Sequence, residues 1–230
     1  MTTKRVVIVG ASRGIGKALV ENFAKREEFE VIALSRNLEK MQADFGVLSS
    51  VKCFEFDLEN NVKIQAKKIF STIGKVDSLI NNAGFLVNKP FEEITSQELQ
   101  KSYQINLFGV FETVQAIIPF LNPSISHIVN ISSMGGFQGS MKFAGLSAYS
   151  TSKAALCSFT ELFAEEYKNS SIAMNCLCLG SVQTEMLEEA FPGYQAPLNP
   201  KEVSEYISDF TINAHKYMKG KIIPLSLTNP

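Results

Sequence analysis

Several features that define other classes of protein are scarce or absent in this sequence of 230 residues. No charge dominates, because 22 basic residues nearly balance 23 acidic ones and the net charge is −1. We therefore expect no nucleic acid and no membrane as partners. Apolar runs such as residues 116–118 and 172–174 are far too short to cross a bilayer. The run at residues 6–9 is too short for a signal peptide, so we expect a cytoplasmic protein.

Cysteine and histidine are also few, which limits metal chemistry. Two cysteines fall two residues apart on one face of an expected strand, but no further Cys or His stands at a zinc-like spacing. The sequence thus predicts no metal, and cysteines that act as small buried apolar residues in a reducing compartment. Neither histidine has an evident partner. The residues concerned are Cys53, Cys157, Cys176, Cys178, His127 and His215.

The chain has no internal repeat, low-complexity stretch or linker, and we expect a single domain over residues 1–230. Strand-like and helix-like segments alternate, which predicts an α/β protein with a doubly wound parallel sheet of about seven strands. The expected strands are 5–9, 30–35, 51–56, 76–81, 125–132, 172–179 and 221–226. The expected helices are 15–27, 38–45, 60–73, 96–120, 150–168 and 201–217.

A glycine-rich turn follows the first expected strand. Gly10, Gly14 and Gly16 separate the apolar run 6–9 from an amphipathic helix with Leu19 and Phe23 on its apolar face. Such a turn directs backbone N–H groups and a helix N-terminus towards an anion, usually a pyrophosphate. The alternative is an ordinary strand-to-helix turn.

Polar residues also end two later strands. The apolar segment 76–80 leads into Asn81-Asn82-Ala83-Gly84, and the segment 127–131 delivers Ser132 and Ser133. Because ligands of open parallel sheets bind outside the carboxyl ends of the strands, we expect these residues to share a site with the glycine turn.

Tyr149 and Lys153 are four residues apart in the sequence Tyr-Ser-Thr-Ser-Lys. On a helix this spacing places both side chains on one face. A neighbouring ammonium is expected to lower the pKa of the phenol and to suit it to acid–base catalysis. The alternative is a half-exposed aromatic beside a solvated lysine.

The ordered set of motifs resembles the short-chain dehydrogenase/reductase family over nearly the whole chain, from Val6 to about Ser226. The resemblance implies a Rossmann-type fold and a homo-oligomer. Three features depart from the family pattern: Val9, the Leu179-Gly180 pair where the family usually has Pro-Gly, and a long segment between the catalytic serine and tyrosine. The catalytic residues that the resemblance implies are Asn106, Ser133, Tyr149 and Lys153.

The same resemblance implies hydride transfer between a nicotinamide and a carbonyl or secondary alcohol. Tyr149 would transfer the proton, Ser133 would bind the carbonyl oxygen, and Lys153 would bind the nicotinamide ribose. Asn106 would distort its helix and hold a water molecule. The alternative from another class is a dinucleotide-binding regulatory or scaffold protein with little turnover. The implied cofactor-binding residues are Gly10, Ser12, Arg13, Gly14, Ile15, Gly16, Ser35, Arg36, Asp57, Leu58, Asn82, Ala83, Gly84, Tyr149, Lys153, Val182 and Thr184.

The end of the second strand indicates which cofactor is used. Sites selective for NAD place an acidic residue there, whereas an arginine accommodates the 2′-phosphate of NADP. Here Ser35 and Arg36 end the strand without an acid, and Arg13 offers a second cation. We therefore expect NADP(H) to be preferred to NAD(H). The alternative is that both arginines are solvated surface charges.

Two segments are expected to cover the site. Prolines and a glycine interrupt regular structure in residues 183–200, which correspond to the family's substrate-binding loop. Residues 134–148 contain two phenylalanines, two methionines and a leucine, and we expect them to form an apolar pocket wall. The alternative is that Phe137 and Phe143 pack on the core or at a subunit interface.

Overall fold

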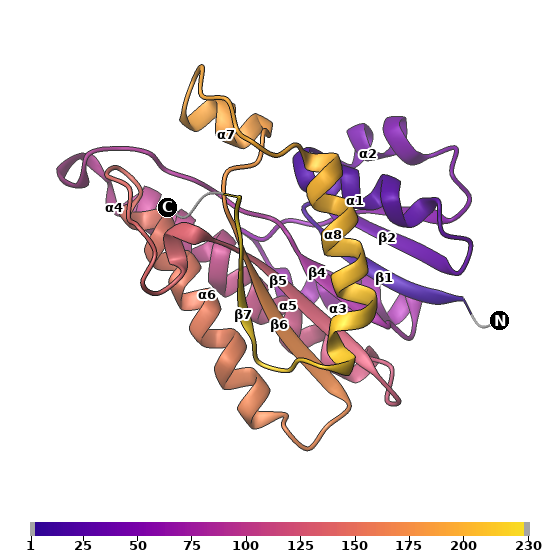
Figure 1. Cartoon of the computed structure of the whole chain (residues 1–230). Helices are drawn as coiled ribbons and strands as arrows, with labels where there is room; N and C mark the ends of the chain where they lie inside the picture. The colour runs from indigo at the N-terminus through magenta and orange to yellow at the C-terminus, as the bar shows by residue number, and fades with distance from the viewer. Residues whose placement is uncertain (1–2, 228–230) are drawn as a thin grey trace.

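The computed structural model describes residues 3–227, and its centre is a parallel sheet of seven strands in the order β3-β2-β1-β4-β5-β6-β7 (Figure 1). Neighbouring strands are in register over four to eight residues, and the longest pairing joins β5 to β6. The strands are β1 Lys4–Val9, β2 Phe29–Ser35, β3 Val51–Glu55, β4 Ser78–Asn81, β5 Ser126–Ser133, β6 Ile172–Leu179 and β7 Ile222–Leu225.

Helices cover both faces of the sheet. On one face α1, α2 and α8 bury apolar residues against the strands, and on the other α3, α5 and α6 do the same. The helices are α1 Gly14–Ala24, α2 Leu38–Phe45, α3 Val62–Ile73, α4 Ser96–Tyr103, α5 Gly109–Ile117, α6 Ser147–Glu166, α7 Glu185–Ala190 and α8 Pro200–Asn213.

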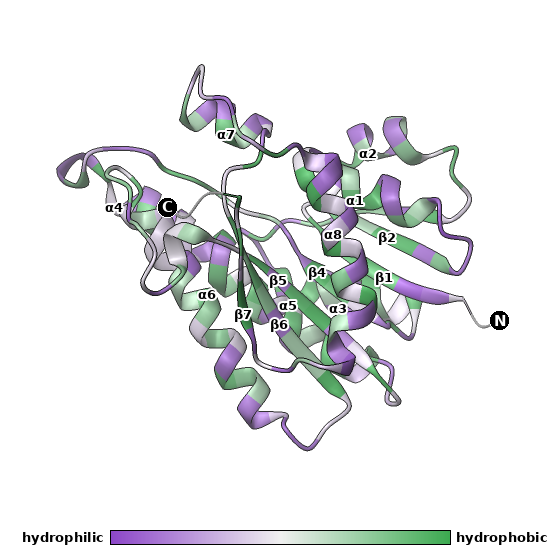
Figure 2. Ribbon diagram, in the orientation of Figure 1, coloured by the Kyte–Doolittle hydropathy of each residue, from purple (hydrophilic) through white to green (hydrophobic). Residues whose placement is uncertain are grey.

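The central strands are apolar on both faces because both faces are covered. Every residue of β6 is buried, and most of the strand residues at the centre of the sheet are green, that is hydrophobic, in Figure 2. This pattern is typical of parallel sheets sandwiched between helices. The expected doubly wound, Rossmann-type α/β fold is confirmed. No helix within residues 3–227 is long and apolar enough to span a membrane.

The strand order fixes the position of the site. The chain runs outward from β1 to β3, then crosses to β4 on the other side of β1. At such a reversal, the connections that follow the two central strands diverge to opposite faces of the sheet and leave a crevice. The glycine turn after β1 and the asparagine turn after β4 border this crevice.

The structure corrects three sequence-based expectations. The segment 183–200 is not wholly irregular, since Thr184 caps the short helix α7 by accepting a hydrogen bond from the Leu187 backbone N–H. The fourth strand begins at Ser78, two residues later than expected. The two histidines are not isolated, because the rings of His127 and His215 lie 5.6 Å apart beneath α8. Sequence spacing could not reveal this contact between residues 88 positions apart.

The expected break near Asn106 is confirmed. A five-residue π-helix, Gln104–Phe108, separates α4 from α5. Single π-turns of this kind commonly occur at functional sites.

Candidate active site

The glycine turn has the backbone that an anion site requires. Gly10 and Gly14 have φ values of +85° and +53°, which side chains with a Cβ rarely adopt. A Cβ at Gly16 would lie 1.9 Å from the Gly10 carbonyl oxygen. No side chain caps the N-terminus of α1, so its first N–H groups remain available to a ligand.

Asn82 holds this turn against the end of β4. Its Nδ2 donates to the Gly10 carbonyl oxygen at 3.0 Å, and its backbone N–H donates to the Val9 carbonyl at 3.1 Å. The adjacent Ala83 N–H donates to the same Val9 carbonyl at 2.9 Å. Asn82 is therefore a positioning residue for the cofactor loop, in addition to bordering the cavity.

A cavity of about 710 Å³ opens over the carboxyl ends of the strands, a volume within the range of ordinary ligand pockets. Nearly all of the predicted site residues line it. They are Gly10, Ser12, Arg13, Gly14, Ile15, Ser35, Arg36, Asp57, Leu58, Asn82, Ala83, Gly84, Ser133, Tyr149, Lys153, Val182 and Thr184. Two predicted residues, Gly16 and Asn106, lie behind the cavity wall, where both are buried.

Asn106 is fully buried and connects three elements. Its Oδ1 accepts from the Phe85 N–H at 2.8 Å, and its Nδ2 donates to the Phe85 carbonyl at 2.9 Å and to the Ser152 hydroxyl at 2.9 Å. The π-turn thus delivers a side chain that ties the loop after β4 to α6. The sequence did not identify Phe85 or Ser152 as partners of Asn106. They lie 21 and 46 positions away, and only the π-turn directs Asn106 towards both.

Three further predicted catalytic residues meet on one side of the cavity. Ser133 ends β5, where its hydroxyl accepts from the Gly135 N–H at 3.1 Å and lies near enough to the Tyr149 phenol to lower its pKa. Lys153 follows one turn after Tyr149 on α6 and is 3% exposed. Its Nζ donates to the Ile131 carbonyl at 2.8 Å and lies 5.9 Å from the centre of the Tyr149 ring.

The pKa values differ from the expectation drawn from the sequence. Burial raises the pKa of Tyr149 to about 12, although its hydrogen bond to Ser133 opposes the shift. Burial also lowers the pKa of Lys153 to about 8. The expectation that Lys153 makes the phenol acidic is therefore wrong for the free protein, because desolvation raises the pKa of Tyr149 while the Lys153 ammonium donates to the Ile131 carbonyl.

Both predicted 2′-phosphate cations are paired with carboxylates. Arg36 Nη1 lies 2.6 Å from Glu59 Oε1, and Arg13 Nη1 lies 2.5 Å from Glu189 Oε1 on α7. Arg36 still exposes 62% of its side chain, so its remaining N–H groups can reach a ligand. The sequence did not identify Glu59 and Glu189 as the partners. Glu59 follows β3 and Glu189 lies on α7, so both are far from the arginines along the chain.

Polar side chains also organise the end of the cavity next to β2 and β3. The Ser35 and Ser12 hydroxyls are 2.8 Å apart and join the end of β2 to the glycine turn. The Asp57 carboxylate accepts from the Glu59 N–H at 2.9 Å and from the Asn60 side chain at 2.8 Å. Asp57 therefore stabilises its own turn as well as lining the cavity.

The segment between β5 and α6 contributes to the pocket wall, as expected, but not with both phenylalanines. Phe143 and Met141 line the cavity and are 48% and 57% exposed. Leu146 also lines the cavity and is buried. Phe137 instead packs on a buried cluster of cysteines, so the alternative interpretation holds for this residue.

Helix α7 and the residues after it form another part of the wall. Met186, Leu187, Phe191 and Tyr194 line the cavity, facing it from the segment 183–200. All four side chains belong to the segment that the sequence predicted to lie over the site, and they line its cavity as expected.

The fold, the glycine turn and the Ser133–Tyr149–Lys153 group define a dinucleotide-dependent oxidoreductase. Comparison with known families agrees: residues 4–195 match the model of the short chain dehydrogenases. The chain belongs to the short-chain dehydrogenase family.

Particular relatives are similar over most of their length. Carbonyl reductase family member 4 of Xenopus laevis is 30% identical over 216 residues, which cover 89% of each chain. A short chain dehydrogenase from Salmonella enterica serovar Typhi superposes with a TM-score of 0.88 at 27% identity, covering 97% of this chain and 96% of that one. A short chain dehydrogenase from Shigella flexneri, solved in complex with NADP, gives 0.88 at 26% identity and covers 97% of both chains.

The residues present fit a nicotinamide dinucleotide. The uncapped α1 N-terminus and the close backbone approach at Gly10, where a Cβ would meet Ala83 at 2.7 Å, form a cradle for a pyrophosphate. Lys153 and Tyr149 line the same cavity.

Proposed function

We propose that this protein transfers a hydride between NADP(H) and a carbonyl or secondary alcohol. One observation carries the proposal: Ser133, Tyr149 and Lys153 converge on the same cavity that the uncapped glycine turn borders. A binding module requires the turn but has no need of a proton donor beside it.

The nicotinamide would supply the hydride, and the residues of this chain would manage the proton and the developing charge. Because burial keeps the Tyr149 pKa well above neutrality, the phenol is protonated and ready to donate. Reduction of a carbonyl needs this form, whereas oxidation needs a phenolate. In the free protein the phenol is thus in the form that donates a proton to a carbonyl oxygen.

Ser133 and Lys153 would support this transfer. The Ser133 hydroxyl contacts the phenol and would also bind the substrate oxygen, which fixes the geometry of proton transfer. The Lys153 ammonium would bind the ribose hydroxyls. Asn106 would keep α6 and the loop after β4 at a constant separation. Whether Asn106 also holds a water molecule remains a prediction.

NADP(H) is proposed as the cofactor because Arg36 and Arg13 flank the adenosine end of the cavity. The Shigella relative binds NADP, which supports the proposal. A 2′-phosphate would compete with Glu59 and Glu189 for these guanidinium groups and would gain charge-assisted hydrogen bonds.

A second candidate function is dinucleotide binding without turnover. The Arg13–Glu189 ion pair is the observation that favours it, because this pair holds α7 beside the glycine turn where a dinucleotide would bind. The intact Ser133, Tyr149 and Lys153 group favours catalysis.

The test is a screen of NADPH oxidation against ketones, aldehydes and quinones, run beside fluorescence titration of NADPH. Turnover of at least one carbonyl, lost in Tyr149→Phe, would support the proposal. Tight NADPH binding without turnover of any substrate would support the second candidate.

We also propose that the substrate is an apolar small molecule, because apolar side chains line much of the cavity. We further propose that the protein forms a homo-oligomer, which light scattering in solution would test.

A further inference from the structure

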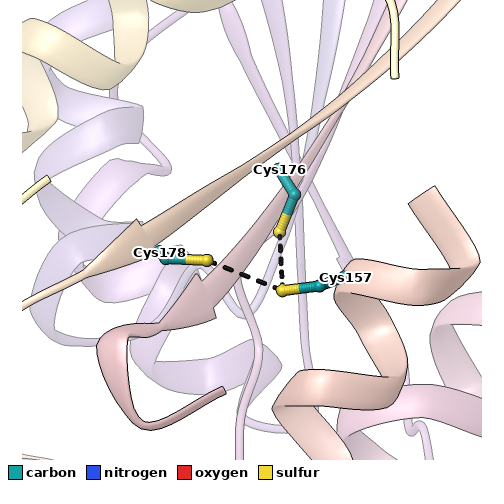
Figure 3. A group of neighbouring side chains, drawn as sticks. All are labelled: Cys157, Cys176 and Cys178. Carbon is teal, nitrogen blue, oxygen red and sulfur yellow. Dashed lines mark hydrogen bonds between the residues drawn. The ribbon is translucent and has the colours of Figure 1, made fainter. Parts of the chain in front are cut away.

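Three of the four cysteines meet behind the active site (Figure 3). Cys176 and Cys178 are two residues apart on β6, so their side chains emerge on the same face of the sheet. Cys157 faces them from α6, one turn after Lys153. All three thiols are free and buried.

The sulfur atoms form a compact triangle. Cys157 Sγ lies 3.5 Å from Cys178 Sγ and 3.9 Å from Cys176 Sγ, and all three atoms lie within 4.8 Å of one another. An ion in the plane of the three sulfur atoms and equally far from each would lie at most about 2.4 Å from every sulfur. This distance is close to the usual metal–thiolate bond length of about 2.3 Å. The triangle is therefore already the size of a three-coordinate metal site.

We propose that Cys157, Cys176 and Cys178 bind one monovalent copper ion. Thiolates are soft ligands and select Cu(I), zinc or iron–sulfur clusters. The thiols that ligate would release their protons to solvent as the metal–sulfur bonds form. No change of oxidation state is involved, because copper is supplied and bound as Cu(I).

The number of ligands distinguishes copper from zinc. Among the described residues, no histidine, aspartate or glutamate joins the three cysteines. Structural zinc sites are almost always tetrahedral and need a fourth ligand. Here the surroundings are apolar, with Met134, Phe137 and Ile222 packed against the sulfurs, so water does not readily complete a tetrahedron. Cu(I) is satisfied by three thiolates in a plane.

Two neighbouring groups support the site. The Ser132 hydroxyl accepts from the Cys157 thiol at 3.4 Å and donates to the Lys153 carbonyl at 2.9 Å, which holds Cys157 in place before the thiol releases its proton. Lys153 is buried one turn before Cys157 on α6, and its ammonium would offset part of the negative charge of three thiolates. The copper site and the catalytic lysine would thus share one buried electrostatic environment.

The experiment uses the full chain and Cu(I) itself, under anaerobic conditions with a colorimetric Cu(I) chelator as competitor. Because the cysteines are buried, copper is added both to the folded protein and during refolding. We expect one Cu(I) per chain and an X-ray absorption spectrum with three sulfur scatterers. Cys176→Ala should weaken binding by more than 100-fold, since even outer-shell partners of a metal contribute about 10–100-fold.

Cys53→Ala is the matched control, because Cys53 lies on β3, away from the cluster, and should bind copper like the parent chain. Cys157→Ala serves if Cys176→Ala does not fold, as judged by near-UV circular dichroism. The proposal is overturned if neither the folded protein nor the refolded protein binds copper. It is also overturned if Cys176→Ala still binds copper, or if the protein binds Zn(II) more tightly than Cu(I). A Cys157–Cys178 disulfide that forms and excludes copper would also overturn it.

Discussion

Lys153 Nζ lies 5.9 Å from the centre of the Tyr149 ring and donates its hydrogen bond to the Ile131 carbonyl instead of to the phenol. The ammonium is therefore held close to the proton donor without bonding to it. Its remaining N–H groups are available to a ribose.

Replacing Tyr149 with phenylalanine should abolish carbonyl reduction and leave NADPH binding nearly unchanged. The substitution removes one hydroxyl, and loss of a general acid typically lowers the rate by about 10²–10⁴-fold. Steady-state rates and fluorescence titration separate the two effects. Tyr206→Phe, on the outer side of α8, is a matched control that should keep full activity. If Tyr149→Phe retained half the activity, the proton would have to come from another group.

Arg36→Asp should reverse the cofactor preference from NADPH to NADH. It removes the guanidinium beside the adenosine end and supplies a carboxylate for a ribose 2′-hydroxyl. The ratio of kcat/KM for the two cofactors measures the change. Glu59→Gln is the companion variant: because it frees Arg36 from its ion pair, it should lower the KM for NADPH. An unchanged ratio in Arg36→Asp would mean that this residue is a solvated charge.

Phe143→Ala should raise KM for bulky apolar carbonyls more than for small polar ones, because Phe143 lines the cavity. Phe137→Ala should lower thermal stability, because that ring packs on the buried cysteines. Substrate kinetics and melting temperature, measured for both variants, test the distinction. An equal loss of activity with all substrates in Phe143→Ala would argue against a pocket wall.

Asn106→Ala should destabilise the protein and reduce activity together. The buried side chain makes three hydrogen bonds to Phe85 and Ser152, and leaving their partners unsatisfied costs about 1–3 kcal/mol for each buried group. Denaturant unfolding and kcat are the measurements. Ser152→Ala removes only one of these bonds and should have a smaller effect. Full stability in Asn106→Ala would show that the π-turn persists without its side chain.

Stability should fall as pH drops from about 6.5 to 4, because of His127. Burial lowers its pKa from 6.5 to about 4, with His215 adding repulsion, and Asn175 and Thr211 bond the neutral ring. The unfolded chain takes up a proton near 6.5, whereas the folded chain does not, so acid favours unfolding. One such group changes the free energy of unfolding by at most about 1.4 kcal/mol per pH unit. His127→Gln should flatten this slope in urea titrations, and an unchanged slope would assign it to other groups.

Most of the fold followed from the sequence because local physics determines it. Apolar runs such as residues 6–9 and 172–179 form strands, since only a sheet covered on both faces can bury them continuously. The glycine turn required Gly10 and Gly14 for their backbone angles, and these could be recognised without coordinates. Tyr149 and Lys153 were linked by helical periodicity alone.

The tertiary structure decided everything that depends on distant partners. Glu59 and Glu189 meet the two arginines, and Cys157 meets the cysteines of β6, only after helices and strands have packed. The pKa of Tyr149 depended on burial, which reversed the shift expected from its neighbour at i+4. Sequence spacing reports which side chains share a helix face or strand face. The desolvation of a group and its contacts with other elements depend on the packed three-dimensional structure, and therefore only that structure could reveal them.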